Sequence, residues 1–118
     1  MNNNVTATLE SAPTATMPTG TVTFLFTDIE GSTRLWEDYA DLMRVALARH
    51  DVLLREACGK HRGYIFKTGG DAFYVAFQAA PDAVAATLTA QQALAAESWP
   101  GGAVIRVRMG VHTGIAEL

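Results

Sequence analysis

Residues 21–33 read TVTFLFTDIEGST. The pattern in this segment changes from that of a strand to that of a helix, and the fold depends on this change. β-Branched and aromatic residues fill a run of strand length, which predicts a central strand that ends at Asp28 and is covered on at least one face. Gly31, Ser32 and Thr33 then favour a tight turn and the start of a helix. The segment therefore predicts a strand, a turn and a helix in direct succession.

The residues that follow continue this alternation of helices and strands. A helix is expected over residues 32–57, with His50 as the place where a break would fall, and strands over 63–68 and 72–77. The expected buried face of that helix is given by apolar residues at near-helical spacing: Leu35, Tyr39, Leu42, Ala46 and Leu53. Gly69 and Gly70 favour a tight turn between the two strands.

A second helix and a last strand complete the pattern. The helix is expected between Pro81 and Pro100, with a face formed by Val84, Leu88, Gln91 and Leu94 or Ala95. Residues 103–114 alternate apolar positions (Ile105, Val107, Met109) with Arg106 and Arg108, which predicts a strand with one dry face and two surface arginines. The order β-α-β-β-α-β predicts an α+β, ferredoxin-like fold: a four-stranded antiparallel sheet with two helices on one face.

This topology brings together two carboxylates that are far apart in the sequence. A right-handed crossover and a tight hairpin place the end of the first strand, at Asp28, beside the start of the third, at Asp71. Two close carboxylates repel unless a cation compensates, and Mg²⁺ commonly takes one or two of them and leaves positions for phosphates. Taken singly, Asp28 could equally be a turn or cap residue, and Asp71 a hairpin residue.

The turn after Asp28 adds a second element of a nucleotide site. The first N–H groups of a helix lack internal partners and favour an anion, and Gly31 allows a close backbone approach. Lys67, at a strand end, is either a solvated charge or a contact to phosphate or base. Carboxylates beside a phosphate cradle suit two-metal phosphoryl or nucleotidyl transfer.

Composition limits the classes of function. With 118 residues, 49% of them hydrophobic, the chain fits one domain, and its formal charge of −3 argues against a broad grip on nucleic acid. No apolar run is long enough to span a membrane, the N-terminus lacks signal-peptide features, and the single cysteine, Cys58, suits a reducing compartment. We expect a cytoplasmic protein with a disordered tail at 1–18 and a domain at 19–118, binding neither membrane nor nucleic acid.

Three segments resemble a known family. FLFTDIEGSTRLWE (24–37), FKTGGDAFYVAF (66–77) and RVRMGVHTG (106–114) are similar to early motifs of the class III nucleotidyl cyclase catalytic domain, particularly its actinobacterial type. The resemblance covers residues 20–118. It implies a homodimer with active sites at a head-to-tail interface, where the 3′-hydroxyl of a nucleoside triphosphate attacks its own α-phosphate to give a 3′,5′-cyclic nucleotide and pyrophosphate.

The resemblance also implies roles for individual positions. Asp28, Asp71 and the carbonyl of Ile29 match ligands of two Mg²⁺ or Mn²⁺ ions. Gly31, Ser32 and Thr33 match the turn around the triphosphate. Lys67 matches the lysine that reads the purine, and ATP is favoured over GTP, so that the product expected is cyclic AMP for second-messenger signalling.

The sequence also departs from the family. The asparagine and arginine that stabilise its transition state have no counterpart up to Leu118, so this stretch carries no catalytic residue of that kind and is expected to be poorly active alone. Two alternatives stay open. One is a non-catalytic nucleotide-binding and dimerisation module for signalling. The other is a diguanylate cyclase, whose signature differs from Gly69–Phe73 at Ala72.

Overall fold

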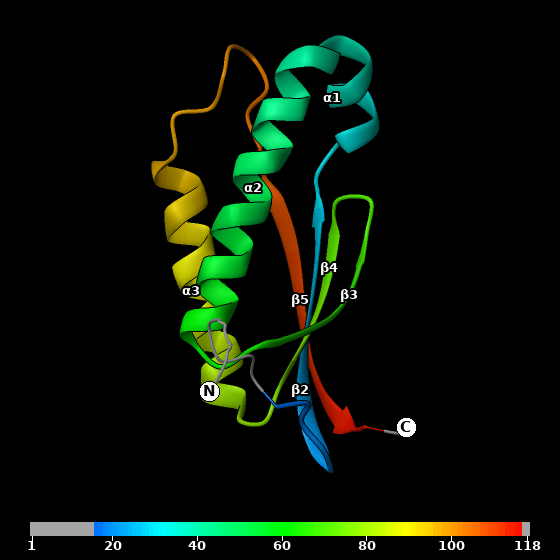
Figure 1. Cartoon of the computed structure of the whole chain (residues 1–118), viewed down its shortest axis with the longest axis vertical. Helices are drawn as coiled ribbons and strands as arrows, with labels where there is room; N and C mark the ends of the chain where they lie inside the picture. Colours follow the sequence, from blue (N-terminus) through cyan, green and yellow to red (C-terminus); the bar gives the residue numbers. More distant parts are fainter. Residues whose placement is uncertain (1–15, 117–118) are drawn as a thin grey trace, which may run out of the picture.

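The computed structural model describes residues 16–116 as one antiparallel sheet with a helical layer on one of its faces (Figure 1). The elements, in chain order, are β2 (Thr21–Ile29), α1 (Ser32–Asp38), α2 (Ala40–Lys60), β3 (Tyr64–Gly69), β4 (Ala72–Phe77), α3 (Ala80–Ala96) and β5 (Val107–Ile115). This confirms the α+β fold expected from the β-α-β-β-α-β order, with the first helix divided in two.

The sheet has the order β3-β4-β2-β5, and every neighbouring pair is antiparallel. β2 is a central strand, as its composition predicted, because β4 and β5 flank it on either side. Its register with β5 runs from Thr21 opposite Ile115 to Ile29 opposite Val107, and its register with β4 ends at Thr27 opposite Phe73. The C-terminal end of β2 therefore lies beside the beginnings of both β4 and β5.

The core lies between the sheet and the helices. Alternate residues of the strands face α2 and α3, because successive strand side chains point to opposite faces. The largest fully buried side chains include Leu25, Phe73, Val75 and Phe77 from the sheet and Met43 and Leu54 from α2. Their packing fixes the frame that carries the loops at the ends of the strands.

The first helix is broken at Tyr39, and the expectation of a break near His50 was wrong. Tyr39 has φ −139° and ψ 45°, outside the helical region, and α2 then runs unbroken to Lys60. Its ring lies against the loop before β5, where a Cβ on Gly102 would come within 2.6 Å of ring atom Cζ. His50 instead sits in the middle of α2, fully buried, with its ring 5.7 Å from that of Phe73.

The predicted buried faces of the two long helices are correct only in part: Ala46, Leu53 and Leu94 are buried, as expected. In α2, Met43 is buried, whereas Leu42 is 37% exposed. In α3, Val84 and Leu88 are exposed, and the buried positions are Ala83, Ala86, Ala90 and Leu94. Small residues on this face leave room for α3 to pack closely on its neighbours, which hydrophobicity alone does not indicate.

The sheet face away from the helices carries an aromatic cluster. Phe24 and Phe26 from β2 lie near Phe66 of β3 and Tyr74 of β4, with ring centroids 5.7–6.3 Å apart. Phe26 and Phe66 are 39% and 41% exposed. We call these four residues the open-face cluster.

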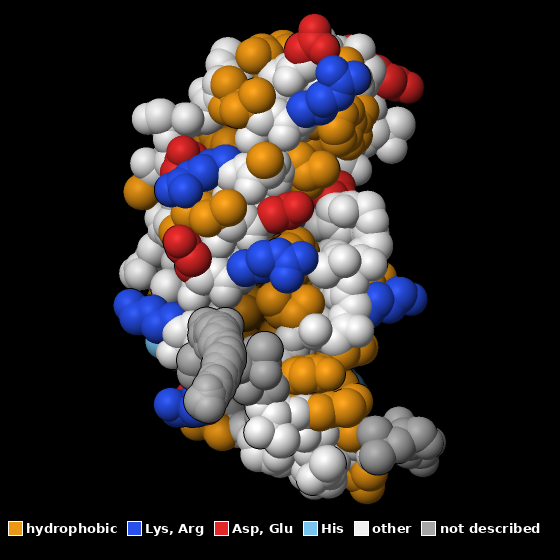
Figure 2. Space-filling model, viewed as in Figure 1, with side chains coloured by type: hydrophobic (Ala, Val, Ile, Leu, Met, Phe, Trp, Pro, Cys, Tyr) orange, Lys and Arg blue, Asp and Glu red, His pale blue; other side chains and the backbone are white. Residues whose placement is uncertain are grey.

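On the face seen in Figure 2, basic and acidic side chains are interspersed with apolar ones, and neither sign of charge forms a continuous field. Of the predicted tail, residues 1–15 lie outside the described part of the chain. Pro18 is buried and, with Met17, lines a hollow on the open sheet face. Among the described helices, none is both long and apolar enough to cross a bilayer.

Candidate functional site

Asp28 and Asp71 lie at the same end of the sheet. Thr27 is opposite Phe73, so the next residue of β2, Asp28, comes level with Ala72, and Asp71 occupies the turn just before β4. Gly70, with φ +60°, makes that turn possible. The hydroxyl of Thr27 also accepts a hydrogen bond of 3.2 Å from the buried N–H of Phe73, which ties the two strand ends together.

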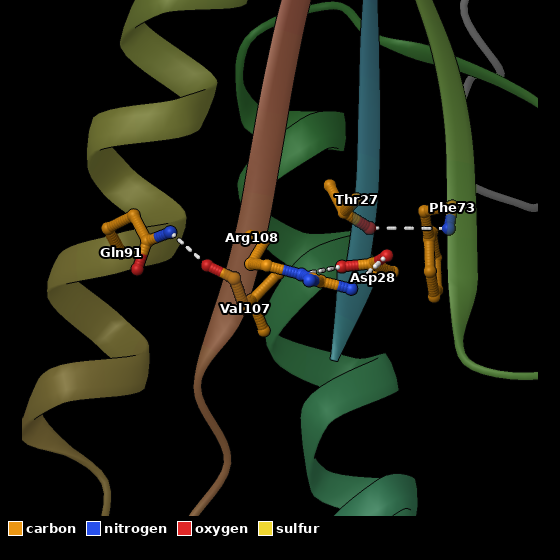
Figure 3. A network of polar contacts seen from close by, with 6 residues as sticks. All are labelled: Thr27, Asp28, Phe73, Gln91, Val107 and Arg108. Atoms are coloured by element: carbon orange, nitrogen blue, oxygen red, sulfur yellow. Dashed lines mark hydrogen bonds and ion pairs between the residues drawn. The ribbon is translucent and has the colours of Figure 1, made fainter. Parts of the chain in front are cut away.

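Asp28 has a partner that the sequence analysis missed. From β5, Arg108 donates to both carboxylate oxygens of Asp28, Nε to Oδ1 and Nη2 to Oδ2, each at 2.8 Å (Figure 3). The two residues face each other directly in the β2–β5 register. Arg108 is exposed, as expected of a surface arginine, but it also forms half of a bidentate ion pair on the open side of the sheet.

The electrostatics of the site follow from this pair. Hydrogen bonding to Arg108 lowers the pKa of Asp28; desolvation opposes this shift, and the charge of Arg108 adds a smaller lowering effect. Conversely, the pKa of Arg108 is raised, first by Asp28 and then by the charges of Glu30 and Asp71. The guanidinium is therefore bonded to one carboxylate, Asp28, and is stabilised in its charged form by two further acidic residues.

The turn after β2 has the form expected of a helix start. Gly31 is the N-cap of α1 in a left-handed conformation, φ +65°, and its carbonyl accepts the first helical hydrogen bond, from Leu35. The N–H groups of Ser32 and Thr33 precede that first bond and so have no partner within the helix. The side chain of Ile29 is apolar and buried, so the backbone carbonyl is the ligand group that this residue could offer.

Lys67 lies apart from the carboxylates, on β3. Its Nζ is 5.4 Å from the centre of the Tyr74 ring, beside the open-face cluster, and the β3–β4 register is irregular between Ile65 and Lys67. A hollow of about 370 Å³ connects the two regions, because Phe26 and Tyr74 line it together with Asp28 and Arg108. The carboxylate of Asp28, the guanidinium of Arg108 and two aromatic rings thus border one open depression.

The donor set at this end of the sheet fits a hard divalent cation. Asp28 and Asp71 supply two carboxylates and Ile29 a carbonyl, which are oxygen ligands of the kind Mg²⁺ uses while keeping positions for water and phosphate. Within residues 16–116, no group of three or more His, Cys, Asp or Glu side chains is gathered closely enough to hold a metal. Any ion here therefore needs ligands from backbone, solvent or substrate as well.

The fold and this site define an α+β domain of ferredoxin-like topology with a carboxylate centre at the open end of its sheet. Comparison with known families is specific: residues 14–117 match the family described as the adenylate and guanylate cyclase catalytic domain. The chain belongs to this family, as its three motifs had indicated.

Similar proteins agree with this assignment. The chain is 38% identical over 121 residues to an adenylate cyclase of Lachancea kluyveri, covering 86% of this chain and 7% of that protein. It is 40% identical over 103 residues to an uncharacterized protein of Mycobacterium tuberculosis, covering 86% and 34%. It also superimposes with TM-score 0.81 and 29% identity on a structure of Trypanosoma brucei adenylate cyclases in their monomeric state, covering 86% and 58%.

More distant structures share the fold. The guanylate cyclase domain of RhGC from Catenaria anguillulae, solved in complex with GTP, gives a TM-score of 0.71 at 21% identity, covering 80% of this chain and 57% of that one. The chain thus spans only a small part, at most about a third, of the curated relatives named above.

Proposed function

We propose that this chain is the metal-binding and triphosphate-binding part of an adenylate cyclase, which converts ATP to 3′,5′-cyclic AMP and pyrophosphate. The observation that carries the proposal is the position of Asp28 and Asp71 at one end of the sheet, next to the turn at Gly31, in a chain of the cyclase family. Metal carboxylates beside a phosphate cradle are what a nucleotidyl transfer site requires.

Each site residue has a definite part in this proposal. Asp28, Asp71 and the carbonyl of Ile29 would hold two Mg²⁺ or Mn²⁺ ions, and the N–H groups of the Gly31–Thr33 turn would orient the triphosphate. Metal ions held there would supply positive charge that activates the attacking 3′-oxygen and stabilises the phosphates. The new bond joins the 3′-oxygen to the α-phosphorus, the bond to the pyrophosphate oxygen breaks, and the hydroxyl proton is released.

The choice of ATP over GTP rests on the similar proteins and on the position of Lys67. Several similar proteins are named adenylate cyclases, with 34–40% identity. Lys67 is exposed beside Tyr74, where its ammonium group is free to contact a purine from the open side of the sheet. We therefore assign base reading to Lys67, and expect Lys67→Glu to change the ratio of ATP to GTP turnover.

A second copy of the chain is proposed as the partner. The open-face cluster exposes aromatic surface that the helical layer does not cover, and the candidate site opens onto the same face through the hollow shared by Phe26, Tyr74, Asp28 and Arg108. Docking another copy there would bury the aromatic rings and close the site from solvent.

The assignment is tested by assaying cyclic AMP formation from ATP and Mn²⁺, using the protein expressed with whatever coding sequence follows residue 118. Asp71→Ala is expected to reduce turnover at least about a hundredfold, since a metal carboxylate is lost. Asp41→Ala removes an acidic side chain that is 94% exposed on α2 and serves as the matched control. Equal rates for wild type and Asp71→Ala would refute the metal assignment.

A non-catalytic signalling module is the second candidate. It is favoured by the ion pair of Asp28 with Arg108, which engages a metal carboxylate within the chain itself. This function predicts Mn²⁺-dependent nucleotide binding without cyclic product in the same assay. A diguanylate cyclase is not proposed, because the chain belongs to the adenylate and guanylate cyclase family.

A further inference from the structure

The ion pair between Asp28 and Arg108 engages the carboxylate that the proposed function assigns to metal. Nε and Nη2 of Arg108 cover Oδ1 and Oδ2 of Asp28, so neither oxygen is left without a donor. A divalent ion at these oxygens must either displace the guanidinium or lie beside a like charge. Both outcomes weaken metal binding relative to a free carboxylate.

The backbone beneath this pair is held by further hydrogen bonds, whereas the side chain of Arg108 is largely exposed. Glu30 N–H donates to the Arg106 carbonyl at 2.8 Å, and the side chain of Gln91 in α3 donates to the Val107 carbonyl at 2.9 Å (Figure 3). The side chain of Arg108 is itself 65% exposed. Rotation of that side chain alone can therefore release Asp28 without disturbing the sheet.

The ion pair also reduces the repulsion between negative charges at the site. Asp28 is bonded to Arg108, and the charges of Glu30 and Asp71 also act on that guanidinium. Negative charges at this end of the sheet repel one another unless a cation compensates them. The guanidinium supplies that cation from within the chain.

From this geometry we propose that Arg108 is a positioning residue that sets the metal affinity of the site: it holds and neutralises the Asp28 carboxylate, and a divalent ion binds there in exchange for it. The inference rests on the proposed function, because it takes Asp28 and Asp71 as the metal ligands. It assigns to Arg108 an effect on ion binding itself, separate from any contact with nucleotide.

The test is Mn²⁺ affinity, measured by electron paramagnetic resonance of the free ion, on the 118-residue chain without nucleotide. Arg108→Ala is expected to tighten Mn²⁺ binding about threefold relative to Arg106→Ala. Arg106→Ala is the matched control, because it removes the same charge from an exposed residue two positions away and leaves the pair intact. Arg108→Gln keeps much of the side-chain stem and repeats the test should the alanine variant fold poorly.

The possible outcomes distinguish a failure of the role of Arg108 from a failure of the proposed metal site. If Asp28→Ala and Asp71→Ala bind Mn²⁺ as well as wild type does, the metal assignment itself is overturned. If these variants lose affinity but Arg108→Ala and Arg108→Gln bind no more tightly than Arg106→Ala, the metal assignment stands and the role of Arg108 is overturned.

A second measurement follows the guanidinium directly. In ¹H–¹⁵N spectra of wild type, the Arg108 Nε–H signal is expected to shift as Mg²⁺ is added and to do so at the concentrations that saturate the site, since its bond to Oδ1 is exchanged. The Arg106 signal is expected to stay in place. An Arg108 signal that does not move while Mg²⁺ binds would show that the ion pair persists and would contradict the proposed exchange.

Discussion

A hydroxyl group decides how the ends of β2 and β4 are joined. Thr27, 4% exposed, accepts a hydrogen bond from the buried N–H of Phe73, while Thr23, 2% exposed in the same strand, bonds only to the hydroxyl of Thr113, an exposed residue. Loss of an acceptor is costly for a buried donor and cheap for one that water can reach.

Thr27→Val is therefore expected to lower the free energy of unfolding by about 1 kcal/mol more than Thr23→Val. Urea denaturation of the two variants, which are identical in chemistry and differ only in the partner left behind, measures the difference. Equal losses would show that Phe73 does not depend on the Thr27 hydroxyl.

Cys58 links stability to alkaline pH. Burial raises the pKa of its thiol from 9.0 to about 12. Between these values the unfolded chain releases a proton that the folded chain keeps, so the stabilisation is complete below pH 9.0 and is lost as the pH rises toward about 12. The slope from this one group approaches about −1.4 kcal/mol per pH unit.

Denaturation of wild type and Cys58→Ala at pH 8 and at pH 10.5 tests this linkage. The alanine variant is expected to be the less stable at pH 8, because it leaves a small cavity, and the gap should narrow at the higher pH. A gap that stays constant would mean that the thiol ionises equally in both states.

At the residue scale, the sequence predicted the position of Asp28 beside Asp71 but not the role of Arg108. The first follows from the topology alone, since a hairpin and a crossover fix which strand ends meet. The second depends on the register between β2 and β5, which pairs residues 80 positions apart. No local pattern encodes that register, and alternation shows only that Arg108 is on the polar face of its strand.

At the scale of elements, the segment joining α2 to β3 is closely packed. A Cβ on Gly63 would lie 2.8 Å from ring atom Cζ of Phe77 and 2.9 Å from Cγ1 of Val75, both fully buried side chains. Gly59, in the last turn of α2, has open space where its Cβ would be. The two glycines therefore differ in whether a methyl group can be accommodated.

Gly63→Ala is expected to lower the free energy of unfolding by about 1–3 kcal/mol through overpacking, whereas Gly59→Ala is expected to raise it by up to about 1 kcal/mol through helix propensity. Thermal unfolding of both variants measures the contrast. Opposite signs are predicted, and a neutral Gly63→Ala would show that Phe77 and Val75 can move aside.

Element positions were more predictable from sequence than helix faces were. β-Branched runs and turn glycines located β2, β3 and β4 to within a residue or so. The face of α3 was misplaced, because Ala83, Ala86 and Ala90 pack inward for their small size while the more hydrophobic Val84 and Leu88 remain exposed. A hydrophobicity pattern ranks side chains by apolar character and does not show where small side chains allow a helix to pack closely on its neighbours.

At the scale of the whole molecule, the proposed dimer predicts that substitutions on the open face and on the helical face have different effects on self-association. Phe66 belongs to the open-face cluster, and Leu88, 58% exposed, lies on α3 in the helical layer. Phe66→Glu is expected to shift the chain toward monomer in sedimentation equilibrium, and Leu88→Glu to leave the association constant unchanged. Dissociation by Leu88→Glu alone would place the interface on the helices instead.

The β2–β5 ladder has a consequence for how the protein is made. The ladder pairs Thr21 with Ile115. β2, the first of the described strands to be translated, therefore obtains its second neighbour from β5, the last of them. During synthesis, β2 can pair with β4 while residues 107–115 are still within the ribosome. Because Arg108 belongs to this later segment, the carboxylate of Asp28 acquires its internal counter-charge only after residues 107–115 have left the ribosome.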